Sequence, residues 1–224
     1  MNASPGGIYT GTLNTGTVSD DLLGIVGENG DGFFYDNTNG AIYRMKVTTM
    51  GNALSGTFRG FAPSGSVFAT GSSVETGTIS GTDVQRSGIT GTASTSAGSS
   101  SFSVQYVASH YEQAASLSAV AGKYVYTFSN GPTTDTVTFT VSSTGVITGS
   151  DTQNCSVSGS LSPINAAYNA YSVAVHSSCP GPINTSYTGI AAYEPAQSGN
   201  APILTFEYDD GSTVALVRQI NKQP

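Results

Sequence analysis

The chain has few side chains that could perform metal or acid–base chemistry, and their spacing groups none of them into a known motif. Its two histidines are His110, in a segment between two β-rich halves, and His176, on the expected polar face of a strand. A zinc site needs three or four His, Cys or carboxylate ligands that converge, and neither histidine has a partner at motif spacing. We therefore expect both histidines on the solvated surface, with no metal and no cofactor bound.

Hydrolytic chemistry has no recognisable motif either. The 32 serines allow many triads on paper, but no G-x-S-x-G turn lies between a strand and a helix. Residues 28–32 (ENGDG) are acidic like a calcium loop, yet they fail its register and lack the distal Glu, so we interpret them as a hairpin tip. Asp209 and Asp210 are interpreted as a turn in the same way. We assign no catalytic residue and expect a protein that is not an enzyme; a hydrolase with a site assembled across strands is an alternative.

The two cysteines have the spacing of a structural disulfide. Cys155 precedes an expected strand at residues 156–161, and Cys179 follows an expected strand at residues 171–176, with residues 163–169 as the connection. If these strands pair antiparallel, the cysteines lie side by side, within the separation of about 7 Å between Cα atoms that a bridge requires. We predict a Cys155–Cys179 disulfide, and with it an oxidising compartment outside the cytoplasm. Two buried free thiols are the alternative.

The composition favours strands over helices. Charged residues make up only 9% of the chain, where a typical soluble domain has about 25%. The Glu, Lys and Arg that normally cover long helices are scarce, whereas Thr, Val, Tyr, Ile and Phe favour strands. A net charge of −7 with seven Lys and Arg disfavours nucleic acid and anionic lipid as partners. No run of about 18 apolar residues is present to span a bilayer, so membrane attachment would need an N-terminal lipid anchor.

Strand and turn signals alternate along the chain in two blocks. We expect a flexible leader at residues 1–7, an N-terminal β domain at 8–108, a linker at 109–122 and a C-terminal β domain at 123–224. The linker holds the only helical signal, an Ala-rich stretch at residues 111–121 followed by a Gly. The expected fold is all-β and mainly antiparallel, with two small barrel-like or sandwich-like halves and one short linker helix. A single β-sandwich is the alternative, and the oligomeric state is left open.

A Ser/Thr-Gly-Ser/Thr tripeptide recurs around Gly56, Gly77, Gly81 and Gly91. It indicates small, strongly curved sheets, because Gly within a strand permits bends and close backbone approach. Plain low complexity is the alternative. Three correspondences between the halves suggest a loose duplication. They pair the openings at residues 7–10 and 122–125, the turns at 29–30 and 143–145, and the strands at 43–47 and 171–175.

The second half carries a set of structural motifs that is tightest between residues 115 and 190. They are residues 115–117 (ASL), 121–124 (AGKY), 145–151 (GVITGSD), 155–159 (CSVSG), 171–173 (YSV) and 187–189 (YTG). In this arrangement the chain resembles a group of uncharacterised proteobacterial lipoproteins, in which a signal peptide and a lipidated Cys precede a Gly/Ser-rich tether and β-rich halves. The resemblance implies export and no catalytic residues. The lipobox Cys of that pattern is missing, and we interpret Met1 as standing in place of a removed export signal.

Together these observations predict a non-catalytic protein of the bacterial envelope, exported to the periplasm, the outer membrane or the cell surface. It is expected to bind a protein partner or a small ligand in a barrel interior or on a sheet face. An adhesin or fibre component is the second class. A closed and filled barrel would argue against an interior ligand, and open edge strands paired between chains would favour assembly.

Overall fold

The computed structural model of the chain describes residues 3–130, 133–180, 184–197 and 200–224. The fold is all-β, with 63% strand and 4% helix in two eight-stranded antiparallel sheets. The chain divides into two compact units, Met1–Gln113 with Thr213–Ala215, and Ala114–Ser212 with Leu216–Pro224. The expectation of two barrel-like halves is therefore confirmed, and the alternative of a single β-sandwich is wrong. The boundary between Gln113 and Ala114 falls within the expected linker.

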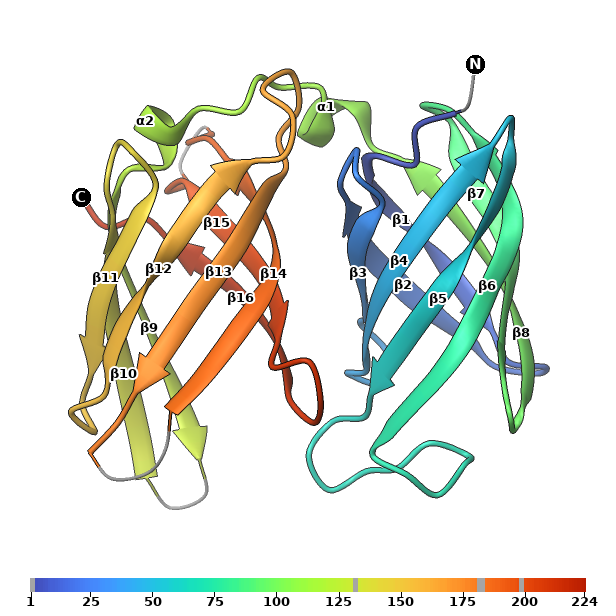
Figure 1. Cartoon of the computed structure of the whole chain (residues 1–224), viewed down its shortest axis with the longest axis horizontal. Helices are drawn as coiled ribbons and strands as arrows, with labels where there is room; N and C mark the ends of the chain where they lie inside the picture. Colours follow the sequence, from blue (N-terminus) through green and yellow to red (C-terminus); the bar gives the residue numbers. More distant parts are fainter. Residues whose placement is uncertain (1–2, 131–132, 181–183, 198–199) are drawn as a thin grey trace. The chain divides into compact units, whose positions relative to one another are not determined.

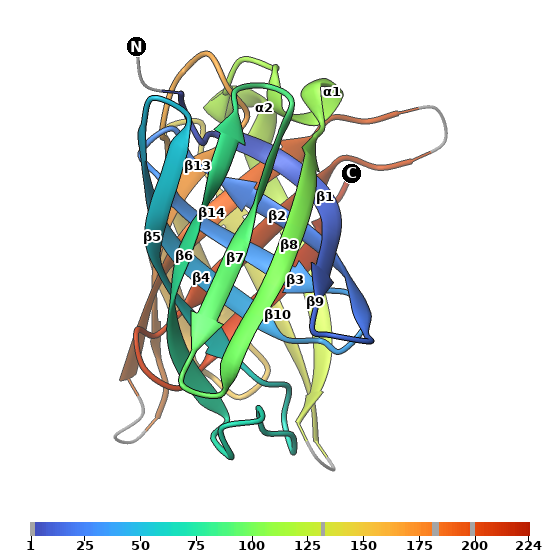
Figure 2. The same cartoon turned by 90° about the vertical axis from the view of Figure 1, so that its right-hand side faces the viewer.

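The first unit is a closed barrel in which successive strands are neighbours. Its strands are β1 Gly7–Asn14, β2 Ser19–Val26, β3 Asp31–Asp36, β4 Ile42–Met50, β5 Ala53–Phe61, β6 Val74–Val84, β7 Gly88–Thr95 and β8 Gly98–Tyr106. β1 also pairs with β8 over six positions, from Tyr9–Tyr106 to Asn14–Ser101, and this pairing closes the barrel. Figure 2 shows β8 beside β1 at this closure.

Glycines and aromatic rings lie opposite each other on the inner face of this barrel. The cross-strand pairs are Gly24 with Phe34, Gly77 with Phe58 and Gly91 with Phe102. A Cβ atom added at Gly77 would lie 2.4 Å from the Phe58 ring. The missing side chain lets the ring lie across the neighbouring strand, as sharply curved sheets require. The Ser/Thr-Gly-Ser/Thr tripeptides thus place Gly inward and hydroxyls outward, which agrees with the curved-sheet interpretation rather than with plain low complexity.

The segment before β1 packs against one end of the barrel, where we expected a flexible leader. Ala3 and Pro5 are buried. The Ala3 N–H donates to the Gly51 carbonyl at 2.9 Å, and the Tyr9 hydroxyl donates to the Pro5 carbonyl at 3.0 Å. The small and polar residues of the leader suggested flexibility, but these hydrogen bonds to the barrel fix the backbone of residues 3–6.

The second unit is a nearly closed eight-stranded sheet in which successive strands are again neighbours (Figure 1). Its strands are β9 Gly122–Asn130, β10 Thr133–Val141, β11 Val146–Asp151, β12 Ser156–Pro163, β13 Tyr171–Ser178, β14 Asn184–Glu194, β15 Ile203–Asp209 and β16 Ala215–Asn221. A bridge between Tyr124 and Lys222 brings the chain after β16 to β9. The inner face repeats the glycine–aromatic pairing, with Phe139 opposite Gly149.

Two short helices lie in the linker, where we expected one at residues 111–121. They are α1 Ala108–Tyr111 and α2 Leu117–Val120 (Figure 1). The expectation of a single helix was wrong because Glu112, with φ −78° and ψ 49°, leaves helical geometry after one turn. A second helix begins after Ser116, which is its N-cap: the Ser116 hydroxyl accepts a hydrogen bond from the Ala119 N–H at 3.2 Å.

The two units begin with the same hydrogen bond. In the first unit the Tyr9 hydroxyl donates to the Pro5 carbonyl, and in the second the Tyr124 hydroxyl donates to the Val120 carbonyl at 2.5 Å. Each tyrosine is the third residue of its unit's first strand, and each acceptor lies four residues earlier in the chain. The correspondence between the openings at residues 7–10 and 122–125 therefore holds in the structure.

The turn between the second and third strands is also shared. The Gly30 carbonyl accepts from the Val47 N–H at 2.9 Å, and the Gly145 carbonyl accepts from the Leu161 N–H at 2.8 Å. These contacts align β4 with β12, the fourth strand of each unit. The third correspondence was therefore wrong, because residues 171–175 lie in β13, the fifth strand of its unit. Alternation of apolar and polar residues is common to most strands and does not identify which two correspond.

Candidate functional site

A cavity of about 840 Å³ occupies the interior of the first barrel, which we call the lumen. Its wall is largely apolar and is formed by inward-pointing side chains of the strands. Representative residues are Leu22, Phe34, Val47, Leu54, Ile79 and Val104. Binding sites for small molecules have volumes of about 300 to 1,000 Å³ and mostly apolar walls with a few polar groups. The lumen has this size and this lining.

The lumen extends to the connections at one end of the barrel, which we call the mouth. Residues of the β1–β2, β3–β4, β5–β6 and β7–β8 connections line it there, among them Thr15, Asn39, Phe68 and Ala97. Phe68 belongs to the long β5–β6 loop, and its ring centroid lies 6.3 Å from that of Tyr43 on β4. The loop thus adds an aromatic ring to the mouth.

Three carboxyl groups lie at the mouth: Asp20 on β2, Asp36 on β3 and Glu75 on β6. The described residues that line the lumen include no Lys, Arg or His. Asp36 is 1% exposed, and its Oδ1 accepts from the Thr38 N–H at 2.8 Å and from the Asn39 N–H at 2.9 Å. These bonds hold the Asp36 carboxylate in place, so the mouth has a fixed negative group.

Asp20 has less support than Asp36, in the form of a side-chain hydrogen bond with Asn39. Its side chain is 4% exposed, and its Oδ1 atom has no hydrogen-bond partner among the described residues. Burial, and then the neighbouring Asp36 carboxylate, raise the pKa of Asp20 above its usual range. A buried carboxylate oxygen without a donor is costly. This oxygen therefore has the capacity to accept a hydrogen bond from a donor inside the lumen.

Glu75 completes the mouth beside two aromatic rings. A Cβ atom added at Gly60 would lie 3.1 Å from Glu75 Cγ, 3.1 Å from Phe68 Cζ and 3.2 Å from Tyr43 Cδ1, so the three side chains meet over this glycine. Burial raises the pKa of the Glu75 carboxyl. Burial also raises the pKa of Tyr43, with smaller effects of Asp36 and Glu75, so the phenol stays protonated at neutral pH.

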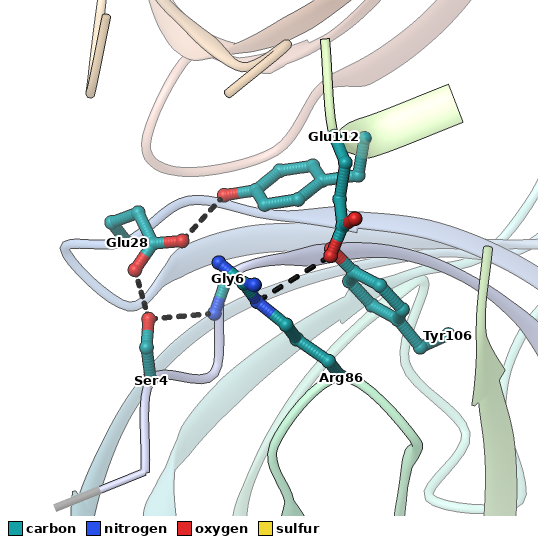
Figure 3. Close-up of polar contacts among 7 residues, drawn as sticks. Ser4, Gly6, Glu28, Arg86, Tyr106 and Glu112 are labelled. Carbon is teal, nitrogen blue, oxygen red and sulfur yellow. Dashed lines mark hydrogen bonds and ion pairs between the residues drawn. The ribbon is translucent and has the colours of Figure 1, made fainter. Parts of the chain in front are cut away.

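A polar network closes the other end of the barrel (Figure 3). Glu28, in the β2–β3 turn, accepts from the Ser4 hydroxyl and from the Tyr111 hydroxyl, the latter at 3.2 Å. Glu112 accepts from the Tyr106 hydroxyl at 3.2 Å and lies 3.4 Å from Arg86 Nε. These contacts tie the leader, the turn and α1 to the strand ends, and their role is structural.

Asp83 lies on the inner face near this closed end. It is 0% exposed, and neither of its carboxyl oxygens has a hydrogen-bond partner among the described residues. Burial, and then the negative charge of Glu28, raise the pKa of Asp83 to about 6. Asp83 does not line the lumen, so we treat it as a determinant of stability.

Aromatic side chains pack against one another in the core of the second unit. Tyr124 stacks on Phe139 at 5.3 Å between ring centroids, and Phe139 meets Phe206 edge-on at 5.7 Å. The Arg218 guanidinium lies 5.6 Å from the ring centroid of Tyr126, a distance typical of a cation–π contact. The described part of the second unit thus has an aromatic-rich core.

The structure shows the predicted disulfide. Cys155 and Cys179 are bonded, with Cα atoms 3.9 Å apart. They flank the first pair of the antiparallel β12–β13 ladder, Ser156 with Ser178, so the expected geometry is confirmed. The disulfide belongs to the second unit, whereas the lumen lies in the first. It indicates an oxidising compartment outside the cytoplasm.

The remaining candidate residues lie apart from the lumen. His176 is exposed, with its Nδ1 atom 3.0 Å from the Ser186 hydroxyl, whereas His110 is half-buried in α1. Residues 28–30 lie in the β2–β3 turn and residues 31–32 begin β3, so the expected hairpin is present. Asp210 lies in the β15–β16 turn, but the expectation of a turn was wrong for Asp209, which is the buried last residue of β15. No group of three or more His, Cys, Asp or Glu side chains in the described ranges could hold a metal ion.

Sequence reasoning missed all three mouth carboxyl groups. Asp20 and Glu75 occupy inward positions in alternation with Leu22 and Ile79, and this was a usable signal, because an acidic residue in an inward register is unusual. Asp36 follows the same alternation after Phe34. The signal was overlooked because acidic residues at strand ends ordinarily belong to solvated turns.

Comparison of the chain with known protein families, curated proteins and solved structures finds no match. In the part of the chain that the structure describes, no helix has the length and apolar character needed to cross a bilayer. The fold and the lumen define the class on their own: an up-and-down β-barrel with a ligand-sized interior, followed by a second, nearly closed eight-stranded unit.

Proposed function

We propose that the protein is a non-catalytic binding protein of the bacterial envelope that holds a small apolar molecule in the lumen of its first barrel. The observation that carries this proposal is the apolar cavity of about 840 Å³ inside a closed barrel. Eight-stranded barrels are wide enough to be filled by side chains or to hold one small ligand. The cavity inside this barrel favours the second arrangement, a barrel that holds one small ligand.

Several features support binding over catalysis or assembly. The described lining of the lumen contains carboxyl groups but neither His nor Cys, so it offers no nucleophile paired with a base of the usual kinds. Pairing of β1 with β8 occupies the edges of the first unit, and the Tyr124–Lys222 bridge brings together the ends of the nearly closed second unit, so little free edge remains for a fibre to recruit another chain. Both features favour a binding protein over the hydrolase and adhesin alternatives.

The proposed location is the periplasm, the outer membrane or the cell surface, and the disulfide supports an oxidising compartment of this kind. A lipid anchor on the exported protein would fit the resemblance to envelope lipoproteins. Fractionation of cells that express the native gene tests this location. Recovery of the protein with reduced cysteines in the cytoplasm would contradict it.

The binding function is tested with N-phenyl-1-naphthylamine, a neutral dye that fluoresces in apolar surroundings. We expect the full chain to bind the dye saturably, with one site per chain. Ala93→Trp places a large ring on the lumen wall and is expected to weaken or abolish binding, since Ala93 lines the cavity. Thr90→Trp is the matched control, because Thr90 is an exposed residue on the same strand.

The two variants separate lumen binding from surface binding. Circular dichroism and thermal unfolding must first show that both variants fold. The proposal is overturned if the folded wild-type chain does not bind the dye, or if Ala93→Trp and Thr90→Trp bind it as the wild type does.

A further inference from the structure

We infer that the ligand of the lumen carries a cationic head group on its apolar body, and that Asp20 and Glu75 at the mouth hold this head. The inference deepens the proposed function and rests on it. It concerns which apolar molecules the barrel selects, and it commits to an organic cation such as an alkylammonium ion.

The charge at the mouth is of one sign. Asp20, Asp36 and Glu75 line the lumen there, and the described lining contains no basic residue. Charged groups in a water-poor site act more strongly than on a solvated surface. An anionic head would meet repulsion from all three carboxyl groups, while a cationic head would be attracted by each.

Asp20 is the residue that points to a bound partner. It is nine-tenths buried, it lines the lumen, and its Oδ1 has no hydrogen-bond donor among the described residues. Asp36 is its diagonal neighbour across the β2–β3 pair, since Asp36 lies opposite Leu22. Two nearby carboxylates with one unsatisfied oxygen form a place where an N–H donor with positive charge would be stabilised. Burial, and then the Asp36 carboxylate, raise the pKa of Asp20, and a cationic head would act in the opposite direction.

Aromatic rings give the head group a second kind of contact. Tyr43 and Phe68 meet Glu75 over Gly60, as described above. An ammonium ion is attracted to the face of an aromatic ring within about 6 Å of its centroid. Carboxylates beside aromatic rings, with an apolar chamber behind them, suit a head that is both cationic and attached to hydrocarbon.

A metal ion fits the same residues less well. The carboxyl groups of the mouth do not form a group of three or more ligands that could hold a metal ion. Calcium requires six to eight oxygen ligands that converge. The wall behind the mouth is apolar, and a bare ion would leave it uncovered.

The inference is tested by displacing N-phenyl-1-naphthylamine from the wild-type chain with three amphiphiles that share a decyl chain. These are decylammonium, decanol and decyl sulfate, each below its aggregation concentration. We expect the cation to compete at least about tenfold more strongly than the alcohol, as one charged contact in a buried site permits. We expect decyl sulfate to compete least.

Asp20→Asn should reduce the affinity for decylammonium about tenfold and leave that for decanol nearly unchanged. Asp21→Asn is the matched control, because Asp21 is the next residue on β2, is exposed and loses the same charge. Glu75→Gln should act in the same direction as Asp20→Asn.

The outcomes separate the inference from the function beneath it. Equal competition by the three amphiphiles, or equal effects of Asp20→Asn and Asp21→Asn, would overturn the cationic head while the binding function stands. Displacement of the cation by millimolar calcium in a manner that depends on Asp20 would also overturn it, in favour of a metal site. If the dye itself does not bind, both the binding function and the cationic head group are overturned.

Discussion

Asp83 couples the stability of the first barrel to pH. Its carboxyl group is fully buried without a hydrogen-bond partner among the described residues, and its pKa is raised to about 6 by burial and then by Glu28. An Asp in an unfolded chain titrates near pH 3.9. Between about pH 4 and pH 6 the folded state therefore holds a proton that the unfolded state has released. The free energy of unfolding falls as pH rises through this window and stays at the lower level above it.

We predict that this fall is about 2 kcal/mol and that Asp83→Asn removes it. The variant stays uncharged, so it should be more stable than the wild type at pH 8 and similar to it at pH 4. Denaturant unfolding at a series of pH values measures the effect. The pKa values of Asp20 and Glu75 are also raised, so these groups make the free energy of unfolding fall with rising pH in the wild type and in the variant alike. Parallel curves for the wild type and Asp83→Asn would contradict the prediction.

At this scale the sequence predicted the cysteines better than the carboxyl groups. Cys155 and Cys179 flank two neighbouring strands, so local pairing alone brings them together. Asp20 on β2 and Glu75 on β6 line the same cavity only because eight strands close into a barrel. Closure depends on contacts between the two ends of the unit, which no local pattern describes.

The tyrosine hydrogen bonds that open the two units allow a paired prediction about elements. Tyr9→Phe and Tyr124→Phe each remove one hydroxyl donor and leave a backbone carbonyl without it. Because the ring remains, we expect each variant to lose about 1 kcal/mol of stability. Hydrogen exchange followed by mass spectrometry measures the loss in the unit that carries the change. Tyr35→Phe, on the half-buried Tyr35 of β3, is the control and is expected to change little.

The shared turn glycine gives a second prediction for an element. Gly30 has φ +79°, and a Cβ atom there would lie 2.0 Å from the Val47 carbonyl oxygen. Gly65 has φ +83° with nothing within 4 Å of such an atom. Gly65→Ala is expected to cost about 1 to 2 kcal/mol from backbone strain alone.

Gly30→Ala should cost roughly 1 to 3 kcal/mol more than Gly65→Ala, because the backbone of β4 has to move. Chemical unfolding of both variants in the same buffer gives the comparison. Equal losses in the two variants would show that the contact with Val47 is unimportant.

The elements that were predicted well are those with local signals. Asn29-Gly30 marked the β2–β3 hairpin, and alternation marked most strands. The predicted helix at residues 111–121 contains α2 but only the last residue of α1, because the Ala-rich stretch has helical propensity throughout and does not show the break at Glu112. For the same reason the leader seemed flexible until its hydrogen bonds to the barrel were seen.

At the scale of the whole molecule, the disulfide is expected to stabilise the second unit. It closes a loop with a sequence separation of 24 residues, and a loop of this size restricts the unfolded chain by about 3 kcal/mol in the entropic model. We predict that the double variant Cys155→Ser with Cys179→Ser lowers the stability of the second unit by this order. Hydrogen exchange resolves the two units, and the barrel of Gly7–Tyr106 serves as the internal reference.

A reductant should reproduce the effect of the double variant in the wild type and have no effect on the variant. Loss of hydrogen-exchange protection confined to the first barrel would contradict the prediction that the disulfide stabilises the second unit. The number of units, their all-β class and this bond were predictable, whereas the lumen was not, since the volume inside a barrel depends on how all eight strands pack.

The order of the strands in the first unit has a consequence for how fast it folds. Each strand from β1 to β8 pairs with the next one in the chain, so seven of its pairings are local hairpins and form with little loss of chain entropy. Only the pairing of β1 with β8 joins segments from opposite ends of the unit. Local contacts speed folding and distant ones slow it. The hairpins should therefore form first. Pairing of β1 with β8 should be the slow step that sets the rate at which the barrel folds and the lumen forms.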